Sequence, residues 1–319
     1  MLLFRPTMKA HLSKALLFVC ALAFGSALQA QTVIATIPVP DPSQIDIDPI
    51  THLVYVADSG AGTVSVIDES SNTVVKTISI GSNPGGVAVN PFTRRLYVAD
   101  VSLGKLYVVN TVNDQVIATL DIPRAGIVAV NLRTNKIYVS DSFHVTVVDG
   151  ATNTVLTSIP ITAAQVVAVN PFTNRVYVAQ DLFPGRVTVI DGNTDQVIAN
   201  PLAGGFLTFA VAVDPIRNLI YATNQFGTVG VIDGSTNTLV TSISVPGQPA
   251  GLAVDPFARQ IYVNDVSLNN VQIIDGATNQ ITGTVPVGNR PTYSAIDFFR
   301  GLLYVGNVVG GSVSVISTH

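Results

Sequence analysis

The stretch NPFTRRLYVAD, Asn90–Asp100, decides the fold because it recurs as NPFTNRVYVAQ, Asn170–Gln180. Looser copies of the phrase RLYVAD occur seven times in the 319-residue chain, and the tyrosines that mark them are Tyr55, Tyr97, Tyr138, Tyr177, Tyr221, Tyr262 and Tyr304. These tyrosines stand roughly 42 residues apart, a period that indicates a repeat architecture.

Each repeat contains four short segments rich in Val, Ile, Tyr and Thr and bounded by turn residues, which is the pattern of β-strands. The segment before each tyrosine ends in Asn or Asp, and Pro follows in five of the seven repeats. Tight turns of the DGATN type begin at Asp149, Asp191, Asp233 and Asp275. Four antiparallel strands in each repeat predict an all-β, seven-bladed β-propeller with four-stranded blades.

The two ends of the chain fit this architecture. The seventh repeat stops at His319 after its third strand, and Thr32–Val39 has the pattern of an isolated fourth strand. We therefore expect residues 31–319 to form one domain whose N-terminal strand completes the last blade and closes the ring, so that no terminal edge stays unpaired. An outer-membrane barrel is the rival fold, but it requires longer strands that alternate apolar and polar residues.

The repeat phrases resemble the YVTN-repeat β-propeller family. The phrases YATN (Tyr221–Asn224) and YVND (Tyr262–Asp265) carry the resemblance, with VNP or VDP upstream and VIDG downstream. The resemblance implies an exported or surface protein, and many members of the family have no assigned activity. Related seven-bladed propellers include lactonases, streptogramin lyases and quinone-associated proteins.

The N-terminus has the pattern of a secretory signal peptide. Basic residues precede the apolar run Ala15–Phe24, and small residues follow it, with cleavage expected after Ala27 or Ala30. The apolar run is shorter than the ~20 residues that cross a bilayer, so we expect no transmembrane segment in the mature chain. The prediction is an exported protein that is periplasmic, secreted or bound to the cell surface.

Removal of residues 1–30 leaves 13 of the 16 basic residues, all 20 acidic residues and no cysteine. The acidic balance makes nucleic acid an unlikely partner, because such binding depends on clustered Lys and Arg. We expect a monomer whose partner is a protein or a small molecule.

Catalytic signatures are missing from the sequence. It contains no G-x-S-x-G, Walker or H-E-x-x-H motif, so we assign no catalytic residue and identify no cofactor. His52 falls in an inter-strand turn, and only His144 of the mature chain's histidines lies in a loop that could face a ligand. A polar residue recurs three positions after each repeat tyrosine. Its acidic members, Asp58, Asp100, Asp141 and Asp265, are weak candidates for metal ligands, and bonding within their own turns is the alternative.

Departures from the repeat gather on one face, which carries the loops from second to third strands and from fourth strands to the next repeat. Aromatic and arginine side chains are enriched at binding hot spots. The candidate binding residues on this face are Phe143, His144, Phe183, Arg186, Phe206, Phe226, Arg124, Arg290 and Tyr293. The alternative is that these side chains fold inward and fill the central channel. On the opposite face we expect ion pairs between blades, made by turn arginines and aspartates.

Three functional hypotheses follow. The first is a non-enzymatic binding scaffold that holds a protein or small ligand on the loop-rich face. The second is a lactonase- or lyase-like enzyme with a metal at the channel mouth. The third is a structural protein of the surface or matrix.

Overall fold

The computed structural model describes residues 31–318. The predicted signal peptide, with its cleavage point after Ala27 or Ala30, lies outside these residues. The described part is all-β, with 27 strands and no helix. None of it forms an apolar helix of membrane-spanning length.

The strands form six antiparallel sheets, five with four strands and one with seven. The first two sheets contain β2 (Pro42–Asp48), β3 (Leu53–Asp58), β4 (Thr63–Asp68) and β5 (Thr73–Ser79), and then β6 (Pro84–Asn90), β7 (Arg95–Asp100), β8 (Lys105–Asn110) and β9 (Gln115–Asp121). The seven-stranded sheet contains β10 (Val128–Asn131), β11 (Lys136–Ser140), β12 (Ser142–Asp149), β13 (Thr154–Asn170), β14 (Arg175–Gln180), β15 (Arg186–Asp191) and β16 (Gln196–Ala199).

The remaining three sheets cover the second half of the chain. Two contain β17 (Thr208–Asp214), β18 (Leu219–Asn224), β19 (Thr228–Asp233) and β20 (Thr238–Ser244), and then β21 (Pro249–Asp255), β22 (Gln260–Asp265), β23 (Asn270–Asp275) and β24 (Gln280–Pro286). The last contains β25 (Pro291–Asp297), β26 (Leu302–Asn307), β27 (Ser312–Ser317) and the N-terminal β1 (Thr32–Pro38), with Ile37 opposite Val313. The pairing of the Thr32–Val39 segment with the last repeat is therefore confirmed.

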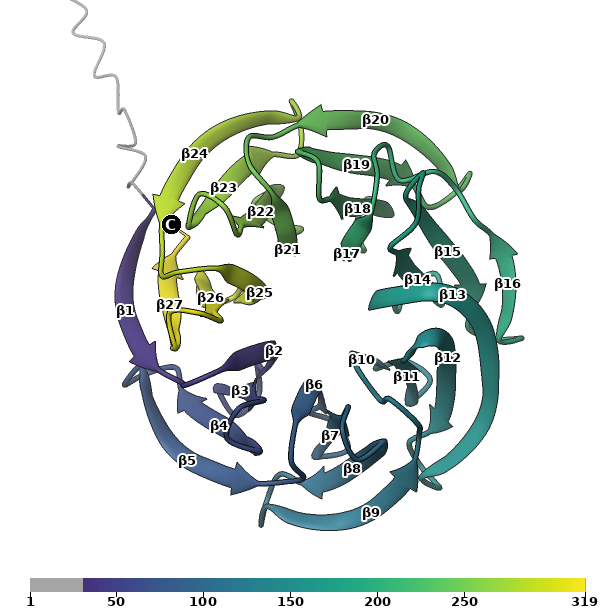
Figure 1. Ribbon diagram of the computed structural model, residues 1–319, viewed down its shortest axis with the longest axis vertical. Helices are drawn as coiled ribbons and strands as arrows, with labels where there is room; N and C mark the ends of the chain where they lie inside the picture. Colours follow the sequence, from purple (N-terminus) through teal and green to yellow (C-terminus); the bar gives the residue numbers. More distant parts are fainter. Residues whose placement is uncertain (1–30, 319) are drawn as a thin grey trace, which may run out of the picture. The chain divides into compact units, whose positions relative to one another are not determined.

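The sheets lie around a central opening, as in a propeller (Figure 1). The first strand of each repeat lines the opening and contacts the first strand of the next repeat. The second strands carry the repeat tyrosines, and all seven tyrosine side chains are buried. Neighbouring sheets pack on both faces of these strands, which explains why the sequence LVYVA shows no alternation of apolar and polar residues.

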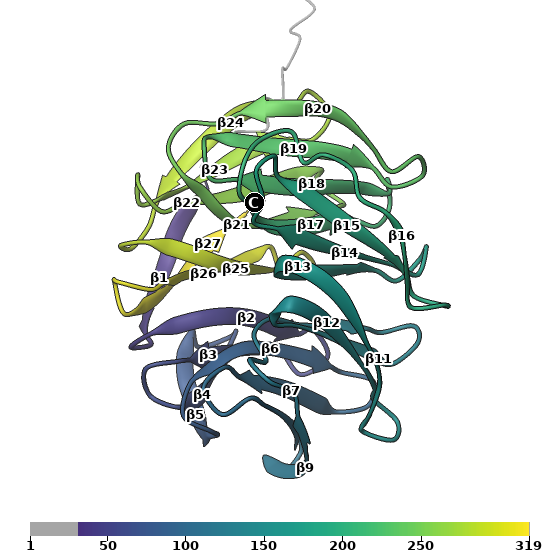
Figure 2. The same ribbon diagram turned by 45° about the vertical axis from the view of Figure 1, so that its right-hand side comes forward.

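The seven-stranded sheet differs from the separate four-stranded sheets that we expected for the third and fourth repeats. The strand β13 pairs with β12 through Thr154–Ala164 and with β14 through Ala164–Asn170. It runs as one strand from the outer side of the array to the central opening (Figures 1 and 2). A left-handed residue, Ala163 (φ 56°), lies where the strand changes partner. The residues between the two repeats therefore keep strand pairing where other repeats have a loop.

Asx turns end the first strands on one side of the sheets. For example, the Asp48 carboxylate accepts the backbone N–H groups of Ile50 (2.9 Å) and Thr51 (3.2 Å). We call this side the turn face. It carries residues 49–52 and 69–72 and their counterparts in the other repeats. The opposite side is the loop-rich face, which carries residues 59–62 and 80–83 and their counterparts.

Candidate functional site

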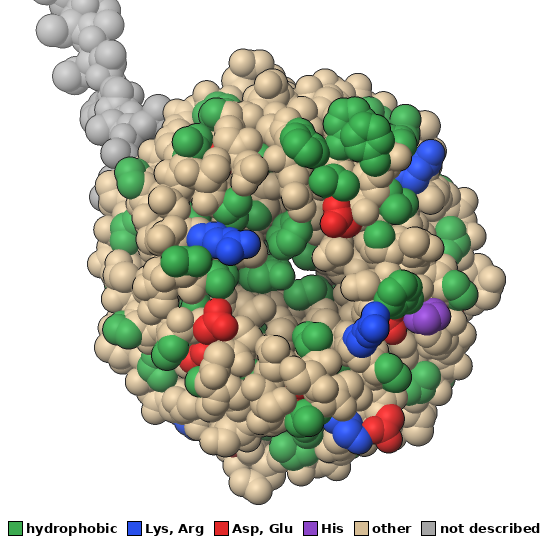
Figure 3. Space-filling view, in the orientation of Figure 1, with side chains coloured by type: hydrophobic (Ala, Val, Ile, Leu, Met, Phe, Trp, Pro, Cys, Tyr) green, Lys and Arg blue, Asp and Glu red, His purple; other side chains and the backbone are tan. Residues whose placement is uncertain are grey.

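A cavity of about 640 Å³ opens on the loop-rich face at the mouth of the central channel. Most of its lining is polar, and three of the predicted site residues line it: Arg124, Asp141 and Tyr293. Figure 3 shows one face of the molecule, with hydrophobic and charged side chains around the central opening. The cavity is large enough for a small organic ligand.

Arg124, Asp141, Phe143 and His144 lie together beside this cavity. The guanidinium carbon of Arg124 lies 5.2 Å from the centre of the Phe143 ring, within cation–π distance. The Asp141 carboxylate accepts the backbone N–H groups of Phe143 (2.9 Å) and His144 (2.6 Å). Its other oxygen lies 3.4 Å from Nδ1 of His144. A second hollow, of about 540 Å³, adjoins these four residues.

Three phenylalanines form an exposed stack on the same face, which we call the aromatic trio: Phe183, Phe206 and Phe226. The rings of Phe183 and Phe206 are stacked with centres 4.2 Å apart, and Phe226 meets Phe206 edge-on at 6.5 Å. The three come from different connections, β14–β15, β16–β17 and β18–β19. Their exposed fractions are 75%, 41% and 66%, so the stack remains open to solvent rather than filling the channel.

The other predicted residues of this face differ in exposure. Arg186 donates to the backbone carbonyl of Asn200 (2.9 Å), and Arg290 is exposed. Tyr293 is half-buried and its ring centre lies 6.1 Å from that of Phe209, where burial raises the pKa of its hydroxyl. Tyr293 therefore turns inward to the channel, as the alternative prediction had it, whereas the aromatic trio and Phe143 lie on the surface.

The four acidic residues at the ends of the second strands accept backbone N–H groups of the loops around them. Asp265 accepts the N–H groups of Ser267 (2.9 Å) and Leu268 (3.0 Å) in its own loop, whereas Asp58 accepts that of Asp41 (3.2 Å) in the connection between β1 and β2. Burial acts to raise the pKa of Asp100, but backbone N–H groups outweigh it, so this pKa lies below its usual range. For Asp58 burial prevails and raises the pKa. Each carboxylate, including Asp141, thus has a structural role in holding the loops of this face.

The turn face carries a feature that the sequence analysis missed, a ring of exposed apolar side chains that we call the apolar rim. One or two positions after the Asn or Asp that ends each first strand stands an exposed residue of this kind: Ile50, Phe92, Leu132, Phe172, Ile216, Phe257 and Phe299. Several of them border a mostly apolar cavity of about 540 Å³. Their regular position in the repeat could be predicted from the sequence. Their exposure could not, because apolar residues next to strands are usually buried.

On the turn face, ion pairs between neighbouring repeats do form, but lysines make two of them: Lys76 pairs with Asp114 (2.6 Å) and Lys136 with Asp195 (2.7 Å). Two of the turn arginines pair within one repeat. Arg175 pairs with Asp191 of the adjacent strand, and Arg217 pairs with Asp214 of its own turn at 2.9 Å. Arg300 is an exception, because its Nε lies 3.8 Å from a carboxylate oxygen of Glu69 in the first repeat.

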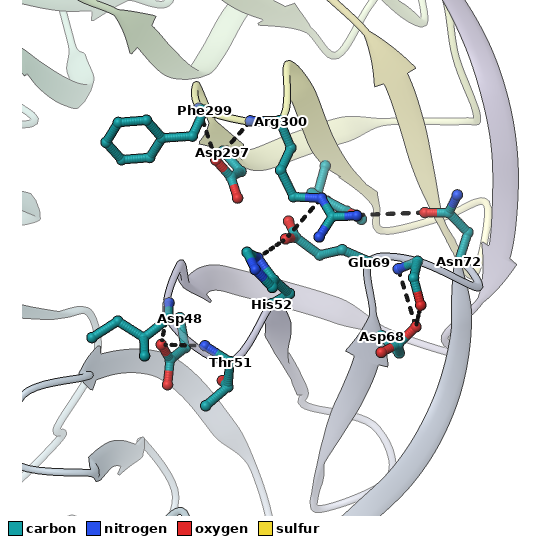
Figure 4. Close-up of polar contacts among 12 residues, drawn as sticks. Asp48, Thr51, His52, Asp68, Glu69, Asn72, Asp297, Phe299 and Arg300 are labelled. Atoms are coloured by element: carbon teal, nitrogen blue, oxygen red, sulfur yellow. Dashed lines mark hydrogen bonds and ion pairs between the residues drawn. The ribbon is translucent and has the colours of Figure 1, made fainter.

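Arg300 belongs to a second candidate site, formed by His52 and Glu69 of the first repeat and Asp297 of the last (Figure 4). One possible ligand atom each from His52, Glu69 and Asp297 lies within 4.8 Å of the other two. Within residues 31–318, no other three His, Cys, Asp or Glu side chains meet this closely. Burial and the charge of Asp297 raise the pKa of Glu69 to about 7, against the opposing effect of Arg300.

The signal for this second site was present in the sequence. Glu69 is the only glutamate of the chain, and it stands where four other repeats have glycine: Gly150, Gly192, Gly234 and Gly276. His52 stands where three other repeats have asparagine: Asn135, Asn174 and Asn218. Comparing the repeats position by position would have selected both residues.

Comparisons with known proteins support the fold alone. No protein-family model matches the chain, and no curated protein matches it. The solved structure described as Kuenenia stuttgartiensis Hydrazine Synthase is similar, with a TM-score of 0.81 and 18% sequence identity over 88% of this chain and 96% of that one. At this identity the likeness shows a shared propeller-like fold and carries no activity across.

Proposed function

We propose that this protein is an exported seven-bladed β-propeller that serves as a rigid scaffold and binds a protein partner through the loop-rich face. The observation that carries the proposal is the aromatic trio. Phe183, Phe206 and Phe226 are held against one another and remain exposed. Exposed aromatic clusters beside polar rims are typical of protein contact sites.

The seven-bladed assignment divides the seven-stranded sheet at β13. Its N-terminal part then completes the third blade with β10–β12, and its C-terminal part begins the fourth with β14–β16. Ring closure is supported by the pairing of β1 with β27 and by a hydrophobic cluster that unites the first and last repeats, in which Ile37 and Val54 pack with Tyr304 and Val313. The first strands β2 and β25 also contact each other across this junction.

A closed ring would make the scaffold rigid, because each blade is then held by two neighbours. Rigidity favours binding, since less conformational entropy is lost when preformed loops meet a partner. Export is proposed from the N-terminal sequence pattern. Assignment to the YVTN-repeat family rests on the same phrases as before, YATN and YVND.

The lactonase- or lyase-like enzyme remains the alternative function. His144, with Asp141 at 3.4 Å, is the side-chain pair beside the 640 Å³ cavity that could exchange a proton with a ligand. The scaffold proposal is preferred because the carboxylate of Asp141 already bonds its own loop, and because the aromatic trio lies outside that cavity.

The test compares two double variants. The protein is immobilised and used to capture partners from the exported fraction of its source cells, and the affinity for each captured protein is then measured with purified components. The variant Phe183→Ser/Phe206→Ser should weaken binding by about 30-fold or more, as expected for hot-spot aromatics. The matched control Phe92→Ser/Phe257→Ser removes two exposed rings from the turn face and should bind normally.

Both variants should fold as well as the wild type, because the substituted rings lie at the surface. Loss of folding in the Phe183→Ser/Phe206→Ser variant would show that the trio is structural. Binding retained by that variant and lost by the control would place the contact on the apolar rim. Turnover of a lactone by the wild type that His144→Asn abolishes would favour the enzyme.

A further inference from the structure

Glu69 is the most unusual buried group in the described part of the chain. Its side chain is fully buried, yet neither carboxylate oxygen makes a hydrogen bond. Its nearest charged partners are Nδ1 of His52 at 3.5 Å and Nε of Arg300 at 3.8 Å, both beyond good hydrogen-bond distance. One oxygen of the buried Asp297 likewise has no partner. Buried carboxylates without partners are costly, so the site provides unused ligand capacity.

We propose that His52, Glu69 and Asp297 form a binding site for a divalent transition metal ion, most suitably Zn²⁺, which joins the first and last repeats. The three side chains supply one imidazole nitrogen and two carboxylate oxygens, a ligand set found in zinc sites. Their ligand atoms lie within 4.8 Å of one another. Ligand atoms around one zinc ion stand about 3–4 Å apart, so side-chain movements of about 1 Å would complete the site.

The residue types select the class of metal. An imidazole ligand favours zinc and its transition-metal neighbours, whereas Ca²⁺ and Mg²⁺ prefer oxygen ligands alone. The two carboxylates would outweigh the single positive charge of Arg300. The Arg300 side chain is 35% exposed and makes no short bond to Glu69, so it can turn toward solvent when a cation binds.

Comparison between repeats indicates that the site is a local departure from an otherwise shared arrangement. The residue at the position of His52 is asparagine in three repeats, with the same left-handed backbone: φ is 58° at His52 and 55°, 52° and 54° at Asn135, Asn174 and Asn218. In those three repeats, the side chain of this asparagine accepts a hydrogen bond from another asparagine, which ends the first strand of the preceding repeat. Asn131, for example, donates to Asn174 at 2.6 Å. Asp297 occupies the donor's position at the junction between the last and first repeats, where an acceptor replaces the donor.

The experiment is calorimetric titration of the purified, EDTA-treated and desalted protein with ZnCl₂. We expect one site that is lost or weakened by more than about 100-fold in His52→Asn and in Asp297→Asn. Since asparagine already stands at the His52 position in three repeats, His52→Asn should fold normally. His144→Asn is the matched control, because His144 also lies near one aspartate, but within residues 31–318 no third metal-ligating side chain joins the two.

Two further readouts keep the result unambiguous. Zinc at about 100 times its dissociation constant should raise the Tm of the wild type by about 5 °C and leave that of His52→Asn unchanged. Co²⁺ should give visible absorption bands in the wild type and in His144→Asn only. The proposal is overturned if the wild type binds no Zn²⁺, if His52→Asn binds it equally well, or if Ca²⁺ binds as tightly as Zn²⁺.

Discussion

Nδ1 of His52 lies 3.5 Å from a carboxylate oxygen of Glu69, where three other repeats pair an asparagine with a glycine. In those repeats the asparagine excludes any side chain at the glycine: a Cβ on Gly150 would lie 2.6 Å from Oδ1 of Asn135. Histidine therefore replaces this asparagine in the one repeat in which the glycine is replaced by a long acidic side chain, that of Glu69. The pair changes the chemistry of the turn without changing its backbone, since His52 keeps the φ of 58° that the asparagines share.

Restoring the common pair should stabilise the metal-free protein. The variant His52→Asn/Glu69→Gly removes a buried carboxylate that has no hydrogen bond, and we expect the free energy of unfolding to rise by about 1–2 kcal/mol, after allowing for the flexibility of glycine. Urea unfolding at pH 7.5 in EDTA measures the change. A loss of stability instead would show that the ion pairs of Glu69 with His52 and Arg300 hold the first and last repeats together.

The junction between β1 and β27 can be tested with two isoleucines on opposite faces of β1. Ile37 is 3% exposed and packs in the cluster that unites the first and last repeats, whereas Ile34 is 51% exposed. Ile37→Ala should lower the free energy of unfolding by about 2–4 kcal/mol because it leaves a cavity. Ile34→Ala should change it by less than about 0.5 kcal/mol. Equal small effects in chemical unfolding would mean that β1 does not close the ring.

The close approach of first strands around the opening predicts a strong effect at Gly251. A Cβ at this position in β21 would lie 2.1 Å from the carbonyl oxygen of Thr292 in β25. Gly251→Ala should therefore destabilise the protein by about 1–3 kcal/mol, since backbone must move. Gly283→Ala, in the outer strand β24, meets only the side chain of Ile273 at 3.2 Å and should be nearly neutral. Thermal unfolding of the two variants would reveal the difference, and similar Tm values would argue against tight packing at the opening.

A half-buried carboxylate in β2, that of Asp46, predicts a specific pH dependence. Burial raises the pKa of Asp46 to about 6, although its carboxylate accepts the N–H groups of Val89 (2.8 Å) and Ile47 (2.9 Å). The unfolded value is 3.8. Between these two values the folded chain holds a proton that the unfolded chain has lost, so stability rises as the pH falls through 6 toward 4. As the pH rises again, this stability is lost, and the loss is complete once folded Asp46 has ionised.

Asp46→Asn removes this titration, and the difference in stability between wild type and variant isolates it from the other groups that titrate near neutral pH. We expect the variant to gain stability relative to the wild type at pH 7.5, and the gap to shrink toward pH 4. Chemical unfolding across this range measures both curves. A gap that is constant with pH would show that the pKa of Asp46 is not raised in the folded protein.

The sequence pattern predicted the secondary structure well because it repeats. Strands around Tyr55 or Tyr262 are short, but the same phrase occurs seven times, so errors in one repeat are corrected by the others. The pairing of Thr32–Val39 with the last repeat was predictable for the same reason, from one missing strand and one extra. The continuous β13 was not predictable, since its pairing across Ala163 depends on where β12 and β14 lie.

The candidate sites were predicted less completely. Placing Phe183, Phe206 and Phe226 on one face followed from the order of strands and loops, but their stacking did not, because they come from three connections whose loop conformations no spacing rule determines. Tyr293 was expected with them, yet it lies in a first strand and turns toward the channel beside Phe209. The apolar rim was missed because the repeat pattern alone does not tell a buried position from an exposed one.

The sequence alone was enough to predict an all-β, propeller-like array of strands. The evidence is local, because each repeat again contains the same spacing, the same turn residues and the same β-branched residues. Which side chains meet depends instead on the packing of the sheets. His52 and Asp297 lie near opposite ends of the described chain and become neighbours because the last sheet packs against the first. Burial then gives these groups their chemistry: the same carboxylate that is ordinary in a solvated turn becomes, as Glu69, a group with a raised pKa and no hydrogen bond.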